Sequence, residues 1–417
     1  MNYLQLFKYN QRLIIFGFLL NFFSSFGQTY VHAQFVPSFI NDFQLTNTQF
    51  GLIYAVATLA GAFSLMYFGK FIDQIDLKNY VLIVTGVLII ACLVILSAQN
   101  FWFLGFGIFL NRLTGQGLLT HISLTSMARY FNKMRGKALS FAVLGHSGGQ
   151  AVFPILMAFL VSWLGWREAI GIEIILILFI LIPFIFYVFK KPIKIVEKIK
   201  EVKAEEDPKN ETSEEISFEK SWKRREVFRD TRFFLFVFSA FSLHFLVTGF
   251  HFFQVDIALS KGWSANWIAV CFIAYAFARA SSSIFTGILI DKFSGIKLTP
   301  FFLIPLMAGL ITMIFFDHYL IAFPYLIGMA ISTGMMASIN SAVLAELYGV
   351  KTLGAIRGMY GTFVIASTSL APFIMGYLID SGFDFNFIMT IALISLGIAS
   401  LLNVKLWKDS EKAITVP

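Results

Sequence analysis

Two arginines lie inside long apolar stretches of the sequence, where a positive charge needs a specific reason. Arg112 stands 11 residues after Phe101, and Arg279 stands 14 residues after Ala265. A guanidinium stays protonated and can hold a carboxylate through two parallel hydrogen bonds. Tyr275 precedes Arg279 by four residues and would share its helical face. The two arginines and this tyrosine are therefore candidates for binding a small anion, and a structural tie between helices is the alternative for Arg112.

Two other apolar stretches carry polar residues at helical spacing. The stripes consist of Asn21, Ser25, Gln28 and His32 in the first stretch and of His244, Thr248, His251 and Gln254 in the second. Polar stripes in otherwise apolar helices face a pore or another helix. Gln28, His32, His251 and Gln254 are further candidates for substrate contact, and hydrogen bonding between helices is the alternative interpretation.

Four titratable residues could carry a coupling proton. His32 and His251 are the first candidates, because imidazole titrates near neutral pH. Asp256 and Glu346, which we expect near the ends of their helices, are their rivals. We expect His121 and His146 to pack between helices, and we leave the role of Glu173 open.

No motif of enzymatic or metal chemistry is evident. Gly145-His146-Ser147-Gly148-Gly149 fits a hydrolase pattern, but that pattern needs a strand before the serine, and here an apolar stretch surrounds it. Small residues that let two helices approach explain it better. The two cysteines, Cys92 and Cys271, are far apart in the sequence. We therefore expect no enzyme activity, no catalytic residues, no cofactor and no metal.

The composition places most of the chain in lipid. The 417 residues are 58% hydrophobic, 17% aromatic and only 13% charged, whereas soluble proteins carry about 25% charged residues. Apolar blocks of about 20 residues span a bilayer core of about 30 Å as helices. Twelve such helices are expected at 13–38, 49–69, 79–98, 101–128, 138–163, 170–189, 233–257, 265–290, 298–316, 319–345, 357–379 and 385–404. The prediction is an all-α membrane protein with twelve transmembrane helices.

The basic residues predict the orientation in the membrane. With a cytoplasmic N-terminus, 28 of the 32 lysines and arginines fall on the cytoplasmic side, and only Arg167 and Lys261 fall outside. Short cytoplasmic loops are rich in lysine and arginine. We therefore expect a multi-pass protein of the plasma (inner) membrane with both termini cytoplasmic. The net charge of +8 reports this topology, and nucleic acid is not expected as a partner.

The chain divides into two similar halves. Residues 190–232 hold thirteen bases and eleven acids and cannot bury apolar surface, so they are predicted to be a charged cytoplasmic linker between bundles of six helices at 1–189 and 233–417. Gly69 and Asp73 recur as Gly287 and Asp291 at an offset of 218 residues. Arg135 recurs as Arg357 after 222 residues, and His32 matches His251 after 219. We infer two pseudo-symmetric six-helix bundles, as in proteins whose halves rock against each other.

These features resemble the major facilitator superfamily over essentially the whole chain. The segment Arg112-Leu-Thr-Gly115-Gln116-Gly117 is similar to the arginine and glycine motif of its fourth helix, and Gly165-Trp166-Arg167 is similar to a common ending of the fifth. The resemblance implies a gate on the cytoplasmic side, formed by Gly69, Asp73, Gly287, Asp291, Lys292, Arg135 and Arg357. Gln74 stands where the family usually has a basic residue. Charged loops that only anchor the chain are the alternative.

Within that superfamily, Arg279 is similar to the substrate-binding arginine of monocarboxylate and oxalate/formate carriers. Those carriers add a lysine on the first or eleventh helix, which this chain lacks. The resemblance thus implies a secondary active transporter that moves a monocarboxylate-type anion with protons by alternating access. A proton-coupled drug or metabolite exporter and, more remotely, a non-transporting membrane sensor are the alternatives. The expected partners are a small-molecule substrate, protons and the lipid bilayer, and we expect a monomer.

Overall fold

The computed structural model describes residues 3–131, 135–190, 222, 224–349 and 353–415, and every regular element in these ranges is helical. The first part of the chain contains α1 (Tyr3–Phe23), η1 (Ser24–Gly27), α2 (Thr29–His32), α3 (Val36–Asp42), α4 (Asn47–Phe68), η2 (Gly69–Asp73), α5 (Leu77–Leu96), α6 (Phe101–Asn111), η3 (Arg112–Leu119), α7 (Thr120–Tyr130), α8 (Arg135–Trp163), α9 (Trp166–Leu176), η5 (Ile177–Leu181) and α10 (Ile182–Phe189). The second part contains α11 (Arg224–Val227), α12 (Thr231–Phe252), α13 (Gln254–Ser260), α14 (Ala265–Phe293), α15 (Gly295–Leu298), α16 (Ile304–Phe315), η6 (Tyr319–Ile321), α17 (Ala322–Tyr348), α18 (Leu353–Asp380) and α19 (Phe385–Thr415). Most of the predicted linker 190–232 lies outside the described residues.

These elements assemble into the twelve-helix fold that the hydropathy predicts. Among the described residues, nine helices are long and apolar enough to cross a membrane, and α16 is a shorter apolar helix. The two remaining spans are interrupted. The first is built from α1, η1, α2 and α3, and the fourth is built from α6, the π-helical η3 and α7. The predicted all-α membrane fold is confirmed, but the first and fourth spans, and the sixth at the π-helical η5, are not regular along their whole length.

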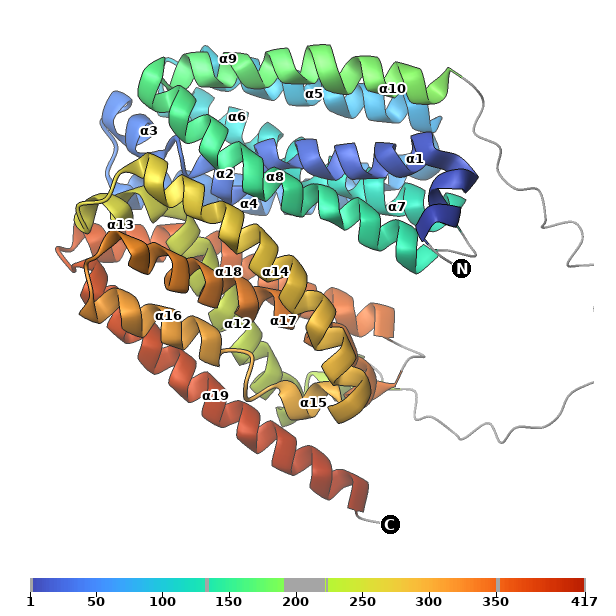
Figure 1. Cartoon of the computed structure of the whole chain (residues 1–417), viewed down its shortest axis with the longest axis vertical. Coiled ribbons are helices and arrows are strands. Elements are labelled where there is room, and N and C mark those ends of the chain that lie inside the picture. Colours follow the sequence, from blue (N-terminus) through green and yellow to red (C-terminus); the bar gives the residue numbers. More distant parts are fainter. Residues whose placement is uncertain (1–2, 132–134, 191–221, 223, 350–352, 416–417) are drawn as a thin grey trace, which may run out of the picture.

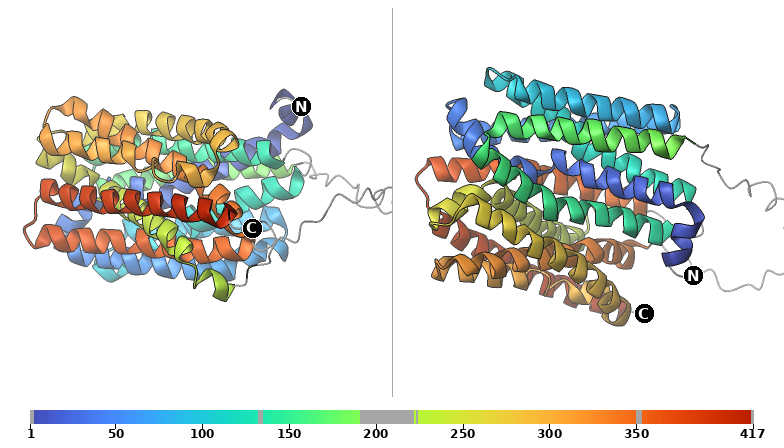
Figure 2. Two further views of the ribbon diagram at one scale, coloured as in Figure 1. Left: turned by 90° about the horizontal axis from the view of Figure 1, so that it is seen from below. Right: turned by 45° about the horizontal axis from the view of Figure 1, so that its top comes forward.

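The helices form two groups that lie side by side. Figure 1 shows the N-terminal bundle, α1–α10, above the C-terminal bundle, α11–α19, and Figure 2 shows both chain ends at the same end of the molecule. We call this the N/C end, and we call the opposite end, where α8 and α18 finish, the far end. The ribbons of α8 and α14 approach each other toward the far end and diverge toward the N/C end.

At the far end the two bundles pack with their backbones in near contact. A Cβ atom on Gly51 of α4 would lie 2.4 Å from the Pro372 carbonyl oxygen of α18, and one on Gly376 would lie 2.5 Å from the Asn47 oxygen. Phe252 of α12 stacks on Phe50 at 5.6 Å between ring centroids. Only glycine permits so close an approach, so this seal depends on both glycines.

One carboxylate ties the bundles together at the same end. Asp380, the last residue of α18, accepts hydrogen bonds from the backbone N–H groups of Asn47 and Thr48 at 3.2 and 2.7 Å. It also accepts from their side chains at 2.9 and 2.6 Å. The first N–H groups of a helix lack partners within the helix and favour an anion. Asp380 therefore caps a helix of the other bundle, and we call this contact the Asp380 clamp.

Candidate functional site

A polar cavity of about 260 Å³ lies between the two bundles. We call it the central cavity. It is lined by Gln28, Thr29, Tyr30, Arg112, Gln116, His146, Gln150, His244, Val247, Thr248, His251, Tyr275, Arg279, Thr333, Met336, Ala337, Asn340 and Thr368. Of the described residues that line it, none is acidic and two are arginines. The cavity therefore offers positive charge and many hydrogen-bond donors to an occupant.

Arg279 projects into this cavity from the middle of α14. Its Nη1 donates a hydrogen bond to Oε1 of Gln150 on α8 at 3.1 Å, so it reaches across to the other bundle. Within the described ranges, no carboxylate forms an ion pair with it. A neutral amide leaves the charge of a guanidinium uncompensated, and such a charge inside a membrane is costly. Arg279 therefore presents an uncompensated positive charge to the cavity.

Arg112 also borders the cavity but is already engaged by the protein. It is 3% exposed, donates from Nη1 to the Gly27 carbonyl at 2.9 Å, and donates from Nε to Thr58 Oγ1 at 3.2 Å. Its guanidinium lies 5.0 Å from the ring centroid of Tyr54. The geometry gives Arg112 the structural role that the sequence left open, while its charge still faces the cavity.

The Arg112 contacts coincide with the break in the first span. After Gly27 the backbone becomes extended at Gln28, with φ −91° and ψ 151°. The carbonyl freed by the break is the one that Arg112 binds. Broken helices at membrane depth are tolerated where the free backbone groups find partners or line a cavity. The break brings Gln28, Thr29 and Tyr30 to the cavity wall.

This break predicts a sharp difference between two glycine substitutions. A Cβ atom on Gly27 would lie 2.4 Å from the backbone nitrogen of Gln116, whereas one on Gly86 in α5 meets nothing within 4 Å. We expect Gly27→Ala to destabilise the folded protein by about 1–3 kcal/mol, as overpacking does. Gly86→Ala should leave stability unchanged or slightly raised, because alanine favours helix. Thermal unfolding in detergent measures both, and equal melting temperatures would contradict the role of Gly27.

The cavity also contains polar residues that the sequence analysis did not single out for it. His146 and Gln150 line it from α8, and Asn340 lines it from α17. His146, which we expected to pack between helices, lies with its ring 5.7 Å from that of Tyr30. Gln150 follows His146 by four residues, so a polar stripe on α8 was the signal that could have found both.

The predicted binding residues divide between the cavity and its surroundings. Arg279, Arg112, Tyr275, Gln28 and His251 line the cavity, and the Tyr275 hydroxyl lies 3.2 Å from Thr333 Oγ1.

His32 and Gln254 are buried but are not among the lining residues. Asp256 lies on α13, and its Oδ2 is buried without a hydrogen-bond partner. Glu346 accepts from the backbone N–H groups of Gly295 and Ile296 at 2.6 and 2.9 Å, so it fixes the start of α15.

The predicted gate residues lie toward the N/C end, and among those whose side chains the structure describes, no two form an ion pair with each other. Asp73 forms an ion pair with Arg129 of its own bundle. The carbonyl oxygen of Gly69 lies 3.1 Å from His121 Nε2. The side chain of Arg135 lies outside the described residues. The three remaining charged members, Asp291, Lys292 and Arg357, are exposed. A Cβ atom on Gly287 would meet nothing within 4 Å.

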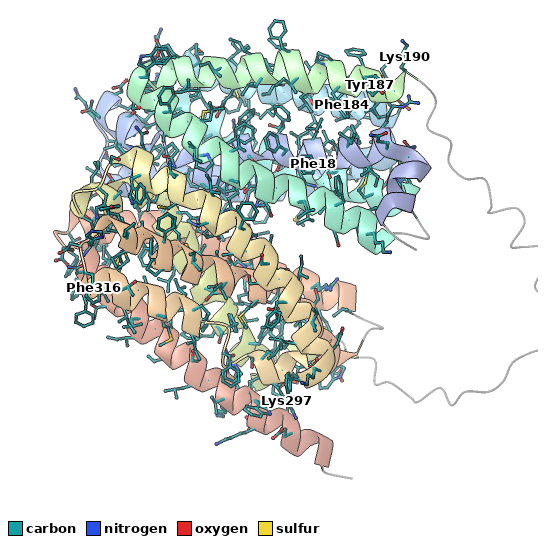
Figure 3. The ribbon with its side chains drawn as sticks, in the orientation of Figure 1. Phe18, Phe184, Tyr187, Lys190, Lys297 and Phe316 are labelled. Atoms are coloured by element: carbon teal, nitrogen blue, oxygen red, sulfur yellow. The ribbon has the colours of Figure 1, made fainter. Side chains whose placement is uncertain are left out.

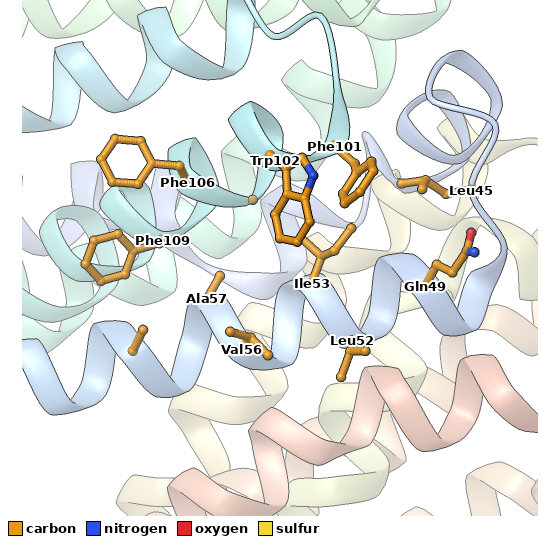
Figure 4. A pocket seen from close by; sticks show the side chains of 12 residues that line it. Leu45, Gln49, Leu52, Ile53, Val56, Ala57, Phe101, Trp102, Phe106 and Phe109 are labelled. Carbon is orange, nitrogen blue, oxygen red and sulfur yellow. The ribbon is translucent and has the colours of Figure 1, made fainter.

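Two further cavities differ in their relation to the central one. A cavity of about 300 Å³ shares Arg112, Gln116 and Thr368 with it and extends to His121, so it continues the central cavity toward the N/C end. A larger groove of about 550 Å³ lies between α4 and α6 at the periphery, and Figure 4 shows its apolar wall, with Gln49 as its polar side chain. Trp102 in this wall is 74% exposed. The groove opens on the outer surface of the bundle, which we expect to face the lipid chains, and its described lining contains no charged residue.

Comparison with known proteins agrees with this architecture. Residues 17–340 match the family model of the Major Facilitator Superfamily. A solved bacterial homologue of the human lysosomal transporter Spinster, in an inward-facing and unoccupied conformation, superposes with a TM-score of 0.72 at 15% identity, covering 96% of this chain and 97% of that one. The nucleoside transporter NupG superposes with a TM-score of 0.67 at 13% identity, covering 95% and 97%.

A curated relative gives a shorter match. An uncharacterized transporter of Buchnera aphidicola subsp. Schizaphis graminum (strain Sg) is 28% identical over 169 residues, which are 39% of this chain and 39% of that protein. The family match spans most of the sequence and includes the break after Gly27, Arg112 and Arg279. The chain belongs to the Major Facilitator Superfamily and is a multi-pass membrane transporter.

Proposed function

We propose that this transporter carries a small organic anion of the monocarboxylate type together with a proton, by alternating access. The observation that carries the proposal is Arg279, a guanidinium in the central cavity whose partner is the neutral Gln150. An incoming carboxylate can replace that amide and gain two charge-assisted hydrogen bonds. Hydroxyl, amide and imidazole groups around the cavity can supply further donors.

The alternative of a cation or drug exporter is less well supported by this cavity. An exporter of cations needs an acidic residue to meet its cargo, and the described residues that line the cavity include none. A cavity that holds two guanidinium groups repels a cation and attracts an anion. We therefore favour anion uptake.

We propose that the N/C end is cytoplasmic, in the plasma (inner) membrane. Figure 3 shows Lys190 and Lys297 toward the N/C end and Phe316 near the far end. Basic residues are expected to remain on the cytoplasmic side, so the position of the two lysines favours this orientation. In this orientation the far end is the outer side. We propose that residues 1–189 and 233–417 rock about the central cavity, with 190–232 joining them. Asp73, Asp291, Lys292, Arg135 and Arg357 would then contribute to the cytoplasmic gate.

Reconstitution into proteoliposomes tests the proposal directly. Radiolabelled lactate, pyruvate, formate and acetate would be offered with the lumen alkaline relative to the medium. We expect at least one of them to accumulate above its outside concentration and a protonophore to abolish the accumulation. Because one anion and one proton together carry no net charge, an imposed membrane potential should have little effect. Accumulation of none of the four, or faster accumulation with the pH gradient inverted, would contradict the proposal.

A further inference from the structure

A buried carboxyl group of the N-terminal bundle has no role in the site described so far. Glu173 on α9 is 2% exposed, and its Oε1 has no hydrogen-bond partner. Its Oε2 accepts from the thiol of Cys92 on α5 at 3.8 Å. Cys92 is thus the titratable residue that contacts Glu173. No charged residue of α5, α8 or the other described elements is paired with Glu173. An isolated buried carboxylate is very costly, so burial favours a bound proton on Glu173.

Polar side chains connect this carboxyl group to the centre of the bundle. Asn111, the last residue of α6, donates from Nδ2 to the sulfur of Cys92 at 3.7 Å. It directly precedes Arg112. Asn111 also lies within hydrogen-bonding reach of His32, and apart from this contact its Oδ1 and the two ring nitrogens of His32 have no partner among the described residues. Four buried polar residues from four elements thus form one connected group, which we call the Glu173 chain: Glu173, Cys92, Asn111 and His32.

The Glu173 chain ends next to the central cavity. The ring of His32 lies 5.7 Å from that of Tyr54. The Tyr54 hydroxyl donates to Thr29 Oγ1 at 3.1 Å, and Thr29 lines the cavity. Purely structural polar networks in protein interiors are normally fully satisfied. The unpartnered Oε1 of Glu173 therefore indicates a carboxyl group that changes its hydrogen bonds, as a proton site does.

We propose that Glu173 binds the proton that moves with the anion, and that Cys92, Asn111 and His32 link it to the central cavity. The inference rests on the proposed anion–proton symport. The proton enters from water in the cavity and adds to one carboxylate oxygen, which converts the carboxylate to a neutral carboxyl group. It leaves by the same route when the anion has been released.

The coupling follows from the charge of the two forms. An ionised Glu173 places a negative charge in the bundle that holds Arg112, and so lowers the positive potential of the cavity. A protonated Glu173 removes that charge, so the anion binds more tightly when the proton is present. By thermodynamic reciprocity, the anion then raises the affinity of Glu173 for the proton. Both ligands are therefore carried together.

Infrared spectroscopy of the purified protein tests the proton site without any substrate. We expect the C=O stretching band of a protonated carboxyl group to disappear in Glu173→Gln and to remain in Glu168→Gln, a control on the exposed first turn of the same helix. In the wild type this band should be lost on raising the pH, and the S–H stretching band of Cys92 should shift over the same pH range. A carboxyl band that Glu173→Gln leaves in place, or that does not respond to pH, would overturn the inference.

Transport of labelled lactate in proteoliposomes tests the coupling. At equal pH on both sides, Glu173→Gln should exchange lactate as the wild type does. Under a gradient of about one pH unit, the wild type should accumulate lactate about tenfold, and Glu173→Gln should reach only the outside concentration. Tenfold accumulation by this variant would overturn the inference while leaving the proposed function intact. A wild type that neither exchanges nor accumulates lactate, pyruvate, formate or acetate would overturn the proposed symport and, with it, the coupling role of Glu173.

Discussion

Arg279→Gln should reduce anion uptake at limiting substrate by about 100-fold. The substitution removes the charge that meets the carboxylate but keeps a shorter side chain that still forms hydrogen bonds. Losing one member of a buried, hydrogen-bonded charge pair costs about 3 kcal/mol, which corresponds to a factor of about 100. The structure supports a specific effect, because the present partner of Arg279 is the neutral Gln150 and not a carboxylate. Initial rates of lactate, pyruvate, formate and acetate uptake in proteoliposomes provide the measurement.

Two further variants separate this effect from a loss of folding. Arg167→Gln is the matched control, because Arg167 pairs with Asp42 at the far end, at 3.1 Å, and lies away from the central cavity. It should transport as the wild type does. Arg279→Lys should retain part of the activity, since an ammonium group keeps the charge but cannot form the two parallel hydrogen bonds. Undiminished uptake by a folded Arg279→Gln protein would refute the anion site.

Asp380→Ala should shift the conformational equilibrium toward a state that is open at the far end. The variant removes four hydrogen bonds between the bundles, two of which cap α4. The clamp is exposed to water, so we discount each bond and expect a total of about 2 kcal/mol, or a roughly 30-fold shift. Spin labels at the exposed positions Leu164 and Phe383, one in each bundle at the far end, would report the shift as a population of longer distances.

Asp384 provides a matched control for the clamp. It lies four residues further along, and its Oδ1 accepts from the backbone N–H of Phe387 in the adjoining helix α19. Asp384→Ala removes a cap of similar chemistry within one bundle, so the distance distribution should stay as in the wild type. If both variants give the wild-type distribution, the glycine contacts alone hold the far end and the Asp380 clamp contributes nothing.

The regular spans could be predicted from the sequence because hydrocarbon thickness fixes their length. The span expected at 265–290 is observed as α14, Ala265–Phe293. The break after Gly27 could not be predicted in this way. It arises from contacts between distant segments, namely the close approach of Gly27 to the backbone of Gln116 and the hydrogen bond from Arg112. Hydropathy records neither contact, since Ser24, Ser25 and Phe26 fit a continuous helix as well as a broken one.

The candidate site could be predicted in part, because polar residues are easily recognised in an apolar stretch. Arg279 stands out because a charge in an apolar stretch is rare, and Gln28 and His251 stand out because they repeat at helical spacing. Gln150, the partner of Arg279, did not stand out in the sequence. It comes from the other bundle, and only the packing of α8 against α14 brings the two residues together. The Glu173 chain was hidden likewise, since Cys92, Asn111 and Glu173 come from three spans and share no sequence pattern.

The tight contact of α4 with α18 has a bearing on energy conservation in the cell. Where a Cβ atom on Gly51 would sit 2.4 Å from a carbonyl oxygen of the opposite helix, there is no room for a file of water molecules. A leak of hydronium or sodium ions between these two helices would need such a file. A resting copy of this protein should thus not leak ions at this contact, and a cell could hold many copies without losing its membrane potential.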